Sequence, residues 1–220
     1  MKIIVTTCDS YMDVLKGFAY MFNKYWSSKA DVTILGYTPP TFYLPDNFEF
    51  ISLGKQRDYG REWTTALIPF FKQLSDEYFI LLLDDMYIQN MDESLLHKAE
   101  EHMAKGADKI FLVNLSGCVG ISEREKDVNF NVVKQNFKFR ASLQPSFIRR
   151  DYFLKYLRPE ESVWQYELDF EAAKNDDAQI LVPKQNIVSF VNLVLKGSGR
   201  LWKIGKEDSD AIKQLGDSEW

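Results

Sequence analysis

Apolar segments of two different periods alternate along the first 113 residues, and this alternation restricts the fold more than any other feature. Five segments have the short apolar or alternating runs typical of β-strands: residues 2–7, 31–37, 47–53, 78–83 and 109–113. Three segments between them place apolar side chains at helical spacing: residues 13–26, 63–74 and 92–105. Strands that alternate with helices predict βαβ units, so we expect an α/β fold with a mostly parallel central sheet and flanking helices.

The pattern changes beyond residue 113, where short strands alternate with polar turns. Helices are expected at residues 149–157 and 164–174, and strands at residues 178–183 and 186–196. A chain of 220 residues suits one domain with a sizeable core. We therefore expect a single domain with a first half, a smaller second half and a loosely ordered polar tail: residues 1–113, 114–203 and 204–220.

Charge and composition exclude several classes of function. The net charge of −5 argues against nucleic acid or an anionic membrane as the main partner. No apolar run approaches the ~20 residues of a membrane span, and the N-terminal run is too short for a signal peptide. Two cysteines give neither a disulfide framework nor zinc spacing. A cytoplasmic protein without a transmembrane segment is expected.

Two adjacent acids follow the most apolar strand, residues 78–83. Asp84 and Asp85 in that place could form a solvated turn or cap the next helix, hold a hard cation, or act as general acid and base. Ligands of α/β sheets bind at the carboxyl ends of strands, where Mg²⁺ or Mn²⁺ is held by carboxylates and substrate phosphates. This context favours the cation site.

The segment after the first strand is expected to face the same crevice if residues 2–7 and 78–83 are near neighbours. Its candidate ligand-binding residues are Thr7, Asp9, Ser10 and Tyr11. Asp9 could contact a nucleotide or simply cap the helix at 13–26. His97 and His102 lie five apart in one predicted helix, which does not stack them on one face, so we expect surface histidines rather than a metal site.

The ordered set of segments resembles the GT-A class of nucleotide-sugar glycosyltransferases, of the bacterial polysaccharide-synthesis kind. The resemblance rests on "IIVTTCDSYMDVLKGFAYMFNKYW", on "EYFILLLDDMYI" with its acidic strand end, and on "ASLQPSFIRRDYFLKYLRPEESVWQYELDFE". It implies a nucleotide-sugar-binding half at residues 1–113 and an acceptor-side half at residues 114–203. It also implies transfer of a sugar to a hydroxyl of a glycan or lipid-linked acceptor, with inversion of configuration.

The acidic motif departs from the Asp-x-Asp pattern of that class, because Met86 stands where a second acid would follow Asp84. The resemblance then implies that Asp85 is the main ligand of Mn²⁺ or Mg²⁺, and that Asp84 binds the metal from further out or contacts the ribose. No Walker loop or GxGxxG motif is present. Phosphate binding would depend on the metal and on Lys196 and Arg200, which are otherwise ordinary surface cations.

A second acidic cluster surrounds Trp164. Glu160 and Glu161 suit the first turn of a helix, with Ser162 as a possible cap. The resemblance implies that one acid here deprotonates the acceptor hydroxyl, with Glu167 preferred and Glu161 as the alternative; six residues apart, they would not share a helical face. It also implies that Trp164 stacks on a sugar. The polar side chain of Gln144 either contacts the sugar or lies in a turn.

Two alternatives to a glycosyltransferase remain open. A sugar nucleotidyltransferase shares the α/β half, although we would then expect a glycine-rich loop with Arg or Lys where this chain has "TTCDSYMD". A non-catalytic sugar- or partner-binding module with a degenerate site would explain Met86. The oligomeric state, the sugar and the nucleotide are not readable from the sequence.

Overall fold

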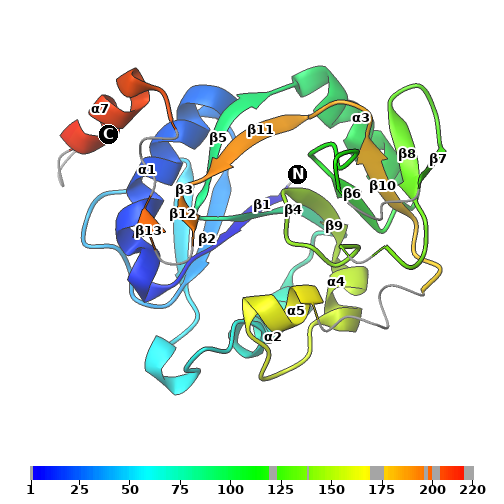
Figure 1. The fold of residues 1–220 in the computed structure, drawn as a ribbon. Helices are drawn as coiled ribbons and strands as arrows, with labels where there is room; N and C mark the ends of the chain where they lie inside the picture. Colours follow the sequence, from blue (N-terminus) through cyan, green and yellow to red (C-terminus); the bar gives the residue numbers. More distant parts are fainter. Residues whose placement is uncertain are drawn as a thin grey trace. The chain divides into compact units, whose positions relative to one another are not determined.

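A computed structural model describes residues 2–118, 123–137, 139–168, 176–195, 198–199 and 204–215 (Figure 1). Its residues cluster into two compact units, each assembled from separate stretches of the chain. The first unit comprises Arg57–Leu81 and Asp92–Ile187, and the second comprises Ile3–Gln56, Leu82–Met91 and the chain from Val188 onward. These units differ from the expected halves at residues 1–113 and 114–203, because the chain passes between the units after Gln56, within β4, after β5 and after Ile187.

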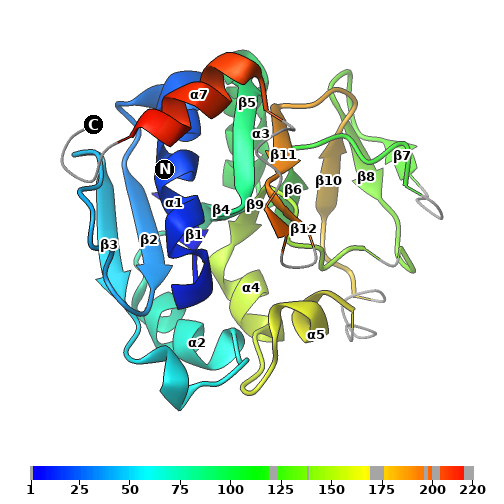
Figure 2. The same ribbon diagram turned by 60° about the vertical axis from the view of Figure 1, so that its left-hand side comes forward.

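Three parallel strands in the order β3-β2-β1 form the sheet of the second unit (Figure 2). Ile3 of β1 pairs with Val32 of β2, which pairs in turn with Phe48 of β3. All five residues of β2 are buried, as expected for a strand covered on both faces. The elements of this part are β1 (Lys2–Thr6), η1 (Asp9–Tyr11), α1 (Met12–Phe22), η2 (Asn23–Ser27), β2 (Val32–Gly36), β3 (Phe48–Ser52) and η3 (Gln56–Asp58).

An antiparallel pair, β5 with β11, also belongs to the second unit, and β5 packs against α1. β5 is a strand that the sequence analysis did not predict, and its residues Met86, Tyr87 and Ile88 are buried. The remaining elements are β5 (Met86–Met91), β11 (Val188–Asn192), β12 (Val194–Leu195), β13 (Ser198–Gly199) and α7 (Lys206–Gln214).

The tail, expected to be loosely ordered, instead forms helix α7, which lies beside α1 in both ribbon views (Figures 1 and 2). Asp208 of α7 is buried and accepts hydrogen bonds from Lys24 Nζ (2.7 Å) and Tyr25 Oη (2.7 Å). An acid that is buried must be paired to be tolerated, and these donors supply the pairing. The polar tail therefore packs through a specific contact, in which Asp208 of α7 binds Lys24 and Tyr25.

The first unit has strands in the order β4-β9-β6-β10-β8-β7. β6 and β10 pair in parallel, and the other neighbours described are antiparallel. β4 has the boundaries expected from the sequence. The elements are α2 (Thr64–Gln73), β4 (Tyr78–Leu83), α3 (Glu93–Ala104), β6 (Lys109–Phe111), β7 (Glu123–Glu125), β8 (Phe130–Val133), β9 (Ser146–Arg149), α4 (Arg150–Tyr156), α5 (Val163–Leu168) and β10 (Ile180–Pro183).

Aromatic side chains join the helices of the first unit to its sheet. The ring of Phe71 on α2 lies 4.8 Å from the rings of both Phe79 on β4 and Phe153 on α4, measured between centroids. Asp92 caps α3 by accepting from the Leu95 N–H at 2.9 Å, and Gly106 follows its end with a φ of 100°. The predicted helix 164–174 is observed as α5 to Leu168, and residues 169–175 lie outside the described part.

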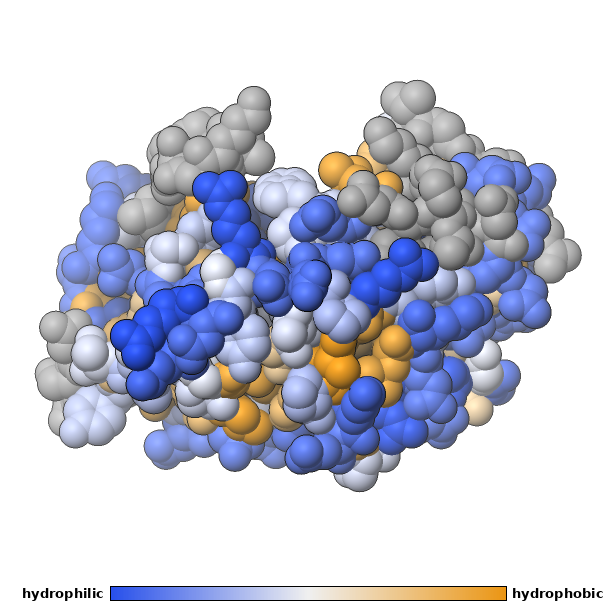
Figure 3. All heavy atoms as spheres, turned by 90° about the horizontal axis from the view of Figure 1, so that it is seen from below, coloured by the Kyte–Doolittle hydropathy of each residue, from blue (hydrophilic) through white to orange (hydrophobic). Residues whose placement is uncertain are grey.

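No helix among the described residues is long and apolar enough to cross a membrane. The face drawn in Figure 3 is mainly hydrophilic outside the grey atoms, and hydrophobic residues reach the surface there in limited patches. The exposed large hydrophobic side chains of the described part are Tyr43, Val128, Trp164 and Leu168.

Gly17 gives a first testable prediction, because a Cβ atom there would lie 2.1 Å from the hydroxyl oxygen of Tyr87. Tyr87 is 1% exposed and donates to the Val14 carbonyl at 2.8 Å, so its ring has no room to move outward. We expect Gly17→Ala to lower the free energy of unfolding by roughly 1–3 kcal/mol, despite the better helix propensity of alanine. Urea unfolding would measure this, with Gly117→Ala as the control because a Cβ there meets no atom within 4 Å. Equal stability of the two variants would contradict the packing of Tyr87 on α1.

Candidate functional site

The two adjacent acids form the turn between β4 and β5, which we call the acidic turn (Asp84 and Asp85). Asp84 is only 4% exposed, and its Oδ2 accepts a hydrogen bond from Thr7 Oγ1 at 2.5 Å. The Asp84 N–H donates to the Thr6 carbonyl at 3.3 Å. The end of β1 is therefore hydrogen-bonded to the acidic turn, which confirms the expectation that these two segments meet.

Burial makes both acids of this turn unusually weak. Burial raises the pKa of Asp84 to about 8; the hydrogen bond from Thr7 acts against this rise, and the neighbouring Asp85 adds to it. Burial also raises the pKa of Asp85, to about 6. A positive charge close by would favour the ionised form of both carboxylates.

The segment after β1 places Cys8 and Tyr11 near the acidic turn. Burial raises the pKa of Tyr11, and Cys8 and both acids of the turn raise it further, so its hydroxyl lies within their electrostatic field. Cys8 Sγ lies 3.0 Å from Ser10 Oγ. The structure thus places Thr7 and Tyr11 close to the acids and Ser10 beside Cys8, and the binding roles of these residues stay predictions.

Asp9 has a different role from the helix cap considered as one of its two interpretations. Its carboxylate accepts from the Thr38 N–H (2.9 Å) and from Thr38 Oγ1 (3.1 Å), and α1 has no side-chain cap. The Asp9 N–H donates to Gln56 Oε1 at 2.7 Å. The capping interpretation was wrong because a partner 29 residues away outcompetes the adjacent helix end. Thr38 and Gln56, which sequence reasoning missed, fix this loop.

Lys196 and Arg200 lie outside the described residues. The strand segment before them is bonded to the acidic turn, because the Leu193 N–H donates to the Asp85 carbonyl at 2.8 Å. Tyr87, which sequence reasoning also missed, anchors the other side of the turn to α1 through Val14. Its position within the short apolar run at residues 86–88, directly after the acids, was the available signal.

Metal ligands in the described residues are limited to small sets, and no group of three or more His, Cys, Asp or Glu side chains converges there. His102, expected at the helix surface, is instead partly buried, and its Nε2 lies 2.7 Å from Asp127 Oδ2. The acidic turn offers two carboxylates, the number that Mg²⁺ commonly takes from a protein when phosphate oxygens and water complete its shell.

The predicted acceptor-side residues belong to the first unit. Glu167 on α5 accepts through Oε1 from the Leu143 N–H (2.7 Å) and from Ser142 Oγ (3.2 Å). Glu161 lies before α5, so the argument from a shared helical face does not apply to it. Its carbonyl accepts from the Trp63 N–H at 2.8 Å, which ties this loop to the start of α2.

Trp164 is 70% exposed on α5, in contrast to the buried Tyr166 two residues later. Ser162 caps this helix as expected: its Oγ accepts from the Gln165 N–H (3.3 Å), while Gln165 Oε1 accepts from the Ser162 N–H (2.9 Å). The backbone of Gln144 is held in a turn, because its carbonyl accepts from Ser146 Oγ at 2.6 Å.

Comparison with solved structures shows that the fold is GT-A-like and Rossmann-like, which confirms the predicted α/β class. S. aureus TarS 1-349 in complex with UDP-GlcNAc aligns with 90% of this chain at 15% identity and a TM-score of 0.54, and the chain spans 60% of that structure's length. UDP-glucose pyrophosphorylase complexed with UDP-glucose aligns at 11% identity, covering 97% of this chain and 98% of its own, with a TM-score of 0.54.

Mannose-1-phosphate geranyltransferase from Thermus thermophilus aligns with 87% of this chain and 76% of its own at 8% identity, with a TM-score of 0.51. No protein-family model matches the sequence. No curated protein matches it either. At these identities the similarity establishes the fold alone.

Proposed function

We propose that this chain is a glycosyltransferase that moves a sugar from a nucleotide-sugar donor to a hydroxyl of a glycan or lipid-linked acceptor. The observation that carries the proposal is the acidic turn. Asp84 and Asp85 stand at the end of a buried strand and have raised pKa values that a cation would offset, and Asp84 is hydrogen-bonded to Thr7 at the end of β1. A fold of the GT-A class supplies the context in which such acids serve a nucleotide diphosphate.

On the donor side, we assign Asp85 as the principal ligand of Mn²⁺ or Mg²⁺ and Asp84 as a further metal or ribose ligand. A metal bound there would neutralise the charge that develops on the departing diphosphate. Thr7 orients Asp84, and Asp9, Ser10 and Tyr11 are proposed to contact the nucleoside. Lys196 and Arg200 are proposed to bind the diphosphate, since cationic side chains make the stronger, charge-assisted hydrogen bonds to phosphate oxygens.

On the acceptor side, we assign Glu167 as the general base, with Glu161 as the alternative. The acceptor oxygen bonds to the anomeric carbon, its proton passes to the carboxylate, and the bond to the nucleoside diphosphate breaks. This single displacement inverts the anomeric configuration. The exposed indole of Trp164 and the amide of Gln144 are proposed to contact the acceptor sugar.

A sugar nucleotidyltransferase is the second candidate, favoured by the similarity to UDP-glucose pyrophosphorylase over 97% of this chain. The segment "TTCDSYMD" after β1 lacks the glycines and cations that would bind a nucleoside triphosphate there, which favours glycosyl transfer. A non-catalytic module with a degenerate acidic motif is the third candidate. The cytoplasmic location and the role in polysaccharide synthesis remain predictions.

Isothermal titration calorimetry with UDP, GDP, CDP and TDP, each with Mn²⁺ and with EDTA, is the first test. We expect one nucleotide to bind, and to bind more tightly with Mn²⁺ than with EDTA. Equal affinity with Mn²⁺ and with EDTA would contradict the metal assignment. Lys196 and Arg200 would then be the groups proposed to bind the diphosphate. No binding of any of the four would favour the non-catalytic module.

A product assay separates the two enzymes. The protein is incubated with UDP-glucose, UDP-GlcNAc or UDP-galactose, first with a panel of saccharide acceptors and then with inorganic pyrophosphate. Release of UDP that depends on an acceptor supports glycosyl transfer. Formation of UTP and a sugar 1-phosphate from pyrophosphate would instead identify a nucleotidyltransferase.

A further inference from the structure

A buried lysine that the proposed reaction does not use stands in the middle of the first unit. Lys109 of β6 is only 2% exposed, and its Nζ lies 4.3 Å from the centre of the Phe111 ring. Burial lowers the pKa of Lys109 to about 7, because a positive charge is unfavourable in a buried position. An apolar side chain of similar volume would avoid that cost. The hydrogen bonds of the Lys109 amine indicate its structural role.

The Lys109 amine binds two carbonyls of one short loop. Nζ donates to the carbonyl of Arg140 at 3.2 Å and to the carbonyl of Ser142 at 2.5 Å. The peptide unit that follows Ser142 carries that carbonyl at one end and the Leu143 N–H at the other. The same N–H donates to Glu167 Oε1 at 2.7 Å. A single peptide unit therefore connects the ammonium group of Lys109 to the carboxylate of Glu167.

This arrangement aligns the peptide dipole with both charges. The carbonyl oxygen, which is the negative end, faces the amine, and the N–H, which is the positive end, faces the carboxylate. Hydrogen bonds linked in such a chain polarise and strengthen one another in a buried site. Ser142 Oγ adds a second donor to the same Glu167 oxygen at 3.2 Å. The loop thus holds Oε1, so that Oε2 is the oxygen expected to take a proton.

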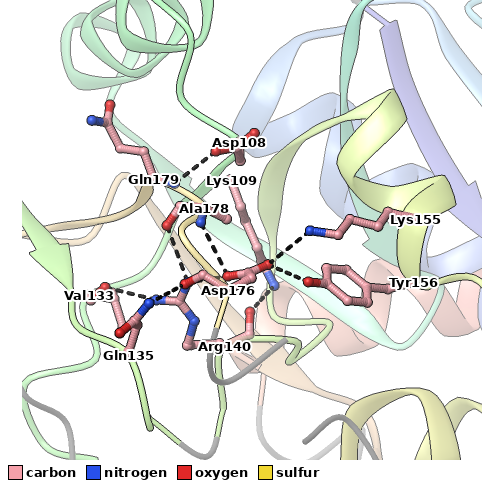
Figure 4. A network of polar contacts seen from close by, with 10 residues as sticks. All are labelled: Asp108, Lys109, Val133, Gln135, Arg140, Lys155, Tyr156, Asp176, Ala178 and Gln179. Carbon is pink, nitrogen blue, oxygen red and sulfur yellow. Dashed lines mark hydrogen bonds and ion pairs between the residues drawn. The ribbon is translucent and has the colours of Figure 1, made fainter. Parts of the chain in front are cut away.

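The other end of the loop is fixed independently of Glu167, by the network drawn in Figure 4. The Arg140 guanidinium donates to the carbonyl of Val133 (3.0 Å) and to Asp176 Oδ1 (2.7 Å). Tyr156 Oη donates to Asp176 Oδ2 at 2.5 Å. Arg140 therefore anchors the loop to the strands, while Lys109 sets the orientation of the peptide that meets Glu167.

We propose that Lys109 is a positioning residue that orients Glu167 through the Ser142–Leu143 peptide unit. The inference rests on the proposed function, in which Glu167 is the general base. A carboxylate that must meet an acceptor hydroxyl at hydrogen-bond distance loses rate steeply when its orientation is relaxed. Lys109 then affects the reaction without touching the substrate.

The test combines steady-state kinetics with a double-mutant cycle on the full chain. Lys109→Met removes the amine and keeps the stem, and we expect it to lower kcat about 10- to 100-fold, with the KM for the nucleotide-sugar changed less than about twofold. In a Glu167→Gln background the same change should have no further effect, because the two residues act as one unit. Lys109→Gln, which keeps an N–H donor, should recover part of kcat. Tyr156→Phe, which alters the network of Figure 4 away from the peptide unit, is the matched control and should retain kcat.

A second readout does not depend on any enzymatic activity. Hydrogen exchange of the Leu143 amide, followed by NMR of the ¹⁵N-labelled protein, should speed up about tenfold or more in Lys109→Met, and by a smaller factor in Lys109→Gln, relative to Tyr156→Phe. Unchanged exchange in both lysine variants would overturn the positioning role, whatever the protein catalyses. Faster exchange in a protein without transferase activity would preserve the contact and refute the proposed function. Equal losses of kcat in the wild-type and Glu167→Gln backgrounds would also overturn the proposal.

Discussion

Replacing Asp85 by alanine is expected to abolish nucleotide-sugar-dependent transfer while the protein stays folded. The Asp85 side chain lies in a turn rather than in a strand, and its backbone carbonyl, which bonds to Leu193, survives the substitution. If Asp85 holds the cation that offsets charge on the leaving diphosphate, its loss removes stabilisation that exists mainly in the transition state. We expect kcat/KM to fall about 100-fold to 1000-fold.

The measurement is transfer rate at saturating Mn²⁺, together with calorimetry of the nucleotide with and without EDTA. Asp46→Ala is the matched control, because Asp46 is an exposed acid in the same unit. The Asp85 variant should bind the nucleotide equally with Mn²⁺ and with EDTA, while its far-ultraviolet circular dichroism and melting temperature resemble those of the control. Full activity of Asp85→Ala would contradict the assignment of the acidic turn as the metal site.

The fold was predictable from the sequence where local pattern and tertiary environment agree. β4 is an uninterrupted apolar run, and the structure reproduces its expected bounds because such a strand is buried on both faces. β5 was missed because the two acids before it were interpreted as the end of a strand, and no second strand was expected directly after them. Its partner β11 lies about 100 residues further along the chain, so only the folded protein reveals the pairing of Met86 with Asn192.

The site was predictable to the extent that it depends on strand ends. Asp84 and Thr7 meet because each terminates or follows a strand of the predicted α/β pattern. The environment of Asp9 was not predictable, because a short-range cap and a long-range bond to Thr38 fit the same residue type. Lys109 gave no signal at all, since a lysine at the start of a strand normally lies in solvent.

The second large effect concerns stability, and it follows from the burial of Asp84. The free energy of unfolding of the metal-free wild-type protein is expected to fall as the pH rises from 5 to 9. We expect this fall to be much smaller in Asp84→Asn. The amide has nearly the same shape as the acid, and its oxygen still accepts from Thr7 Oγ1, but it never has to ionise. The wild-type carboxyl, in contrast, must lose its proton in a buried position as the pKa of about 8 is approached.

The sign follows from proton linkage. The pKa of Asp84 is raised in the folded state, so between about pH 4 and pH 8 the folded protein binds more protons than the unfolded chain. The contribution of this group is therefore fully present below the unfolded pKa and is lost as the pH rises through the folded pKa. A rise from about 4 to about 8 corresponds to on the order of 5 kcal/mol, which is comparable to the whole stability of a small domain.

Urea unfolding at pH 5, 7 and 9 in EDTA tests this expectation, with Asp46→Asn as the control for loss of one acidic charge. Wild type and Asp46→Asn should lose stability in parallel across this range, while Asp84→Asn should lose clearly less and become the most stable of the three at pH 9. Asp85 titrates in all three proteins, so its contribution cancels in the comparison. A steep loss of stability in Asp84→Asn would mean that Asp84 is solvated. A stabilised but inactive variant would show that this protein keeps a costly buried acid for its function rather than for its fold.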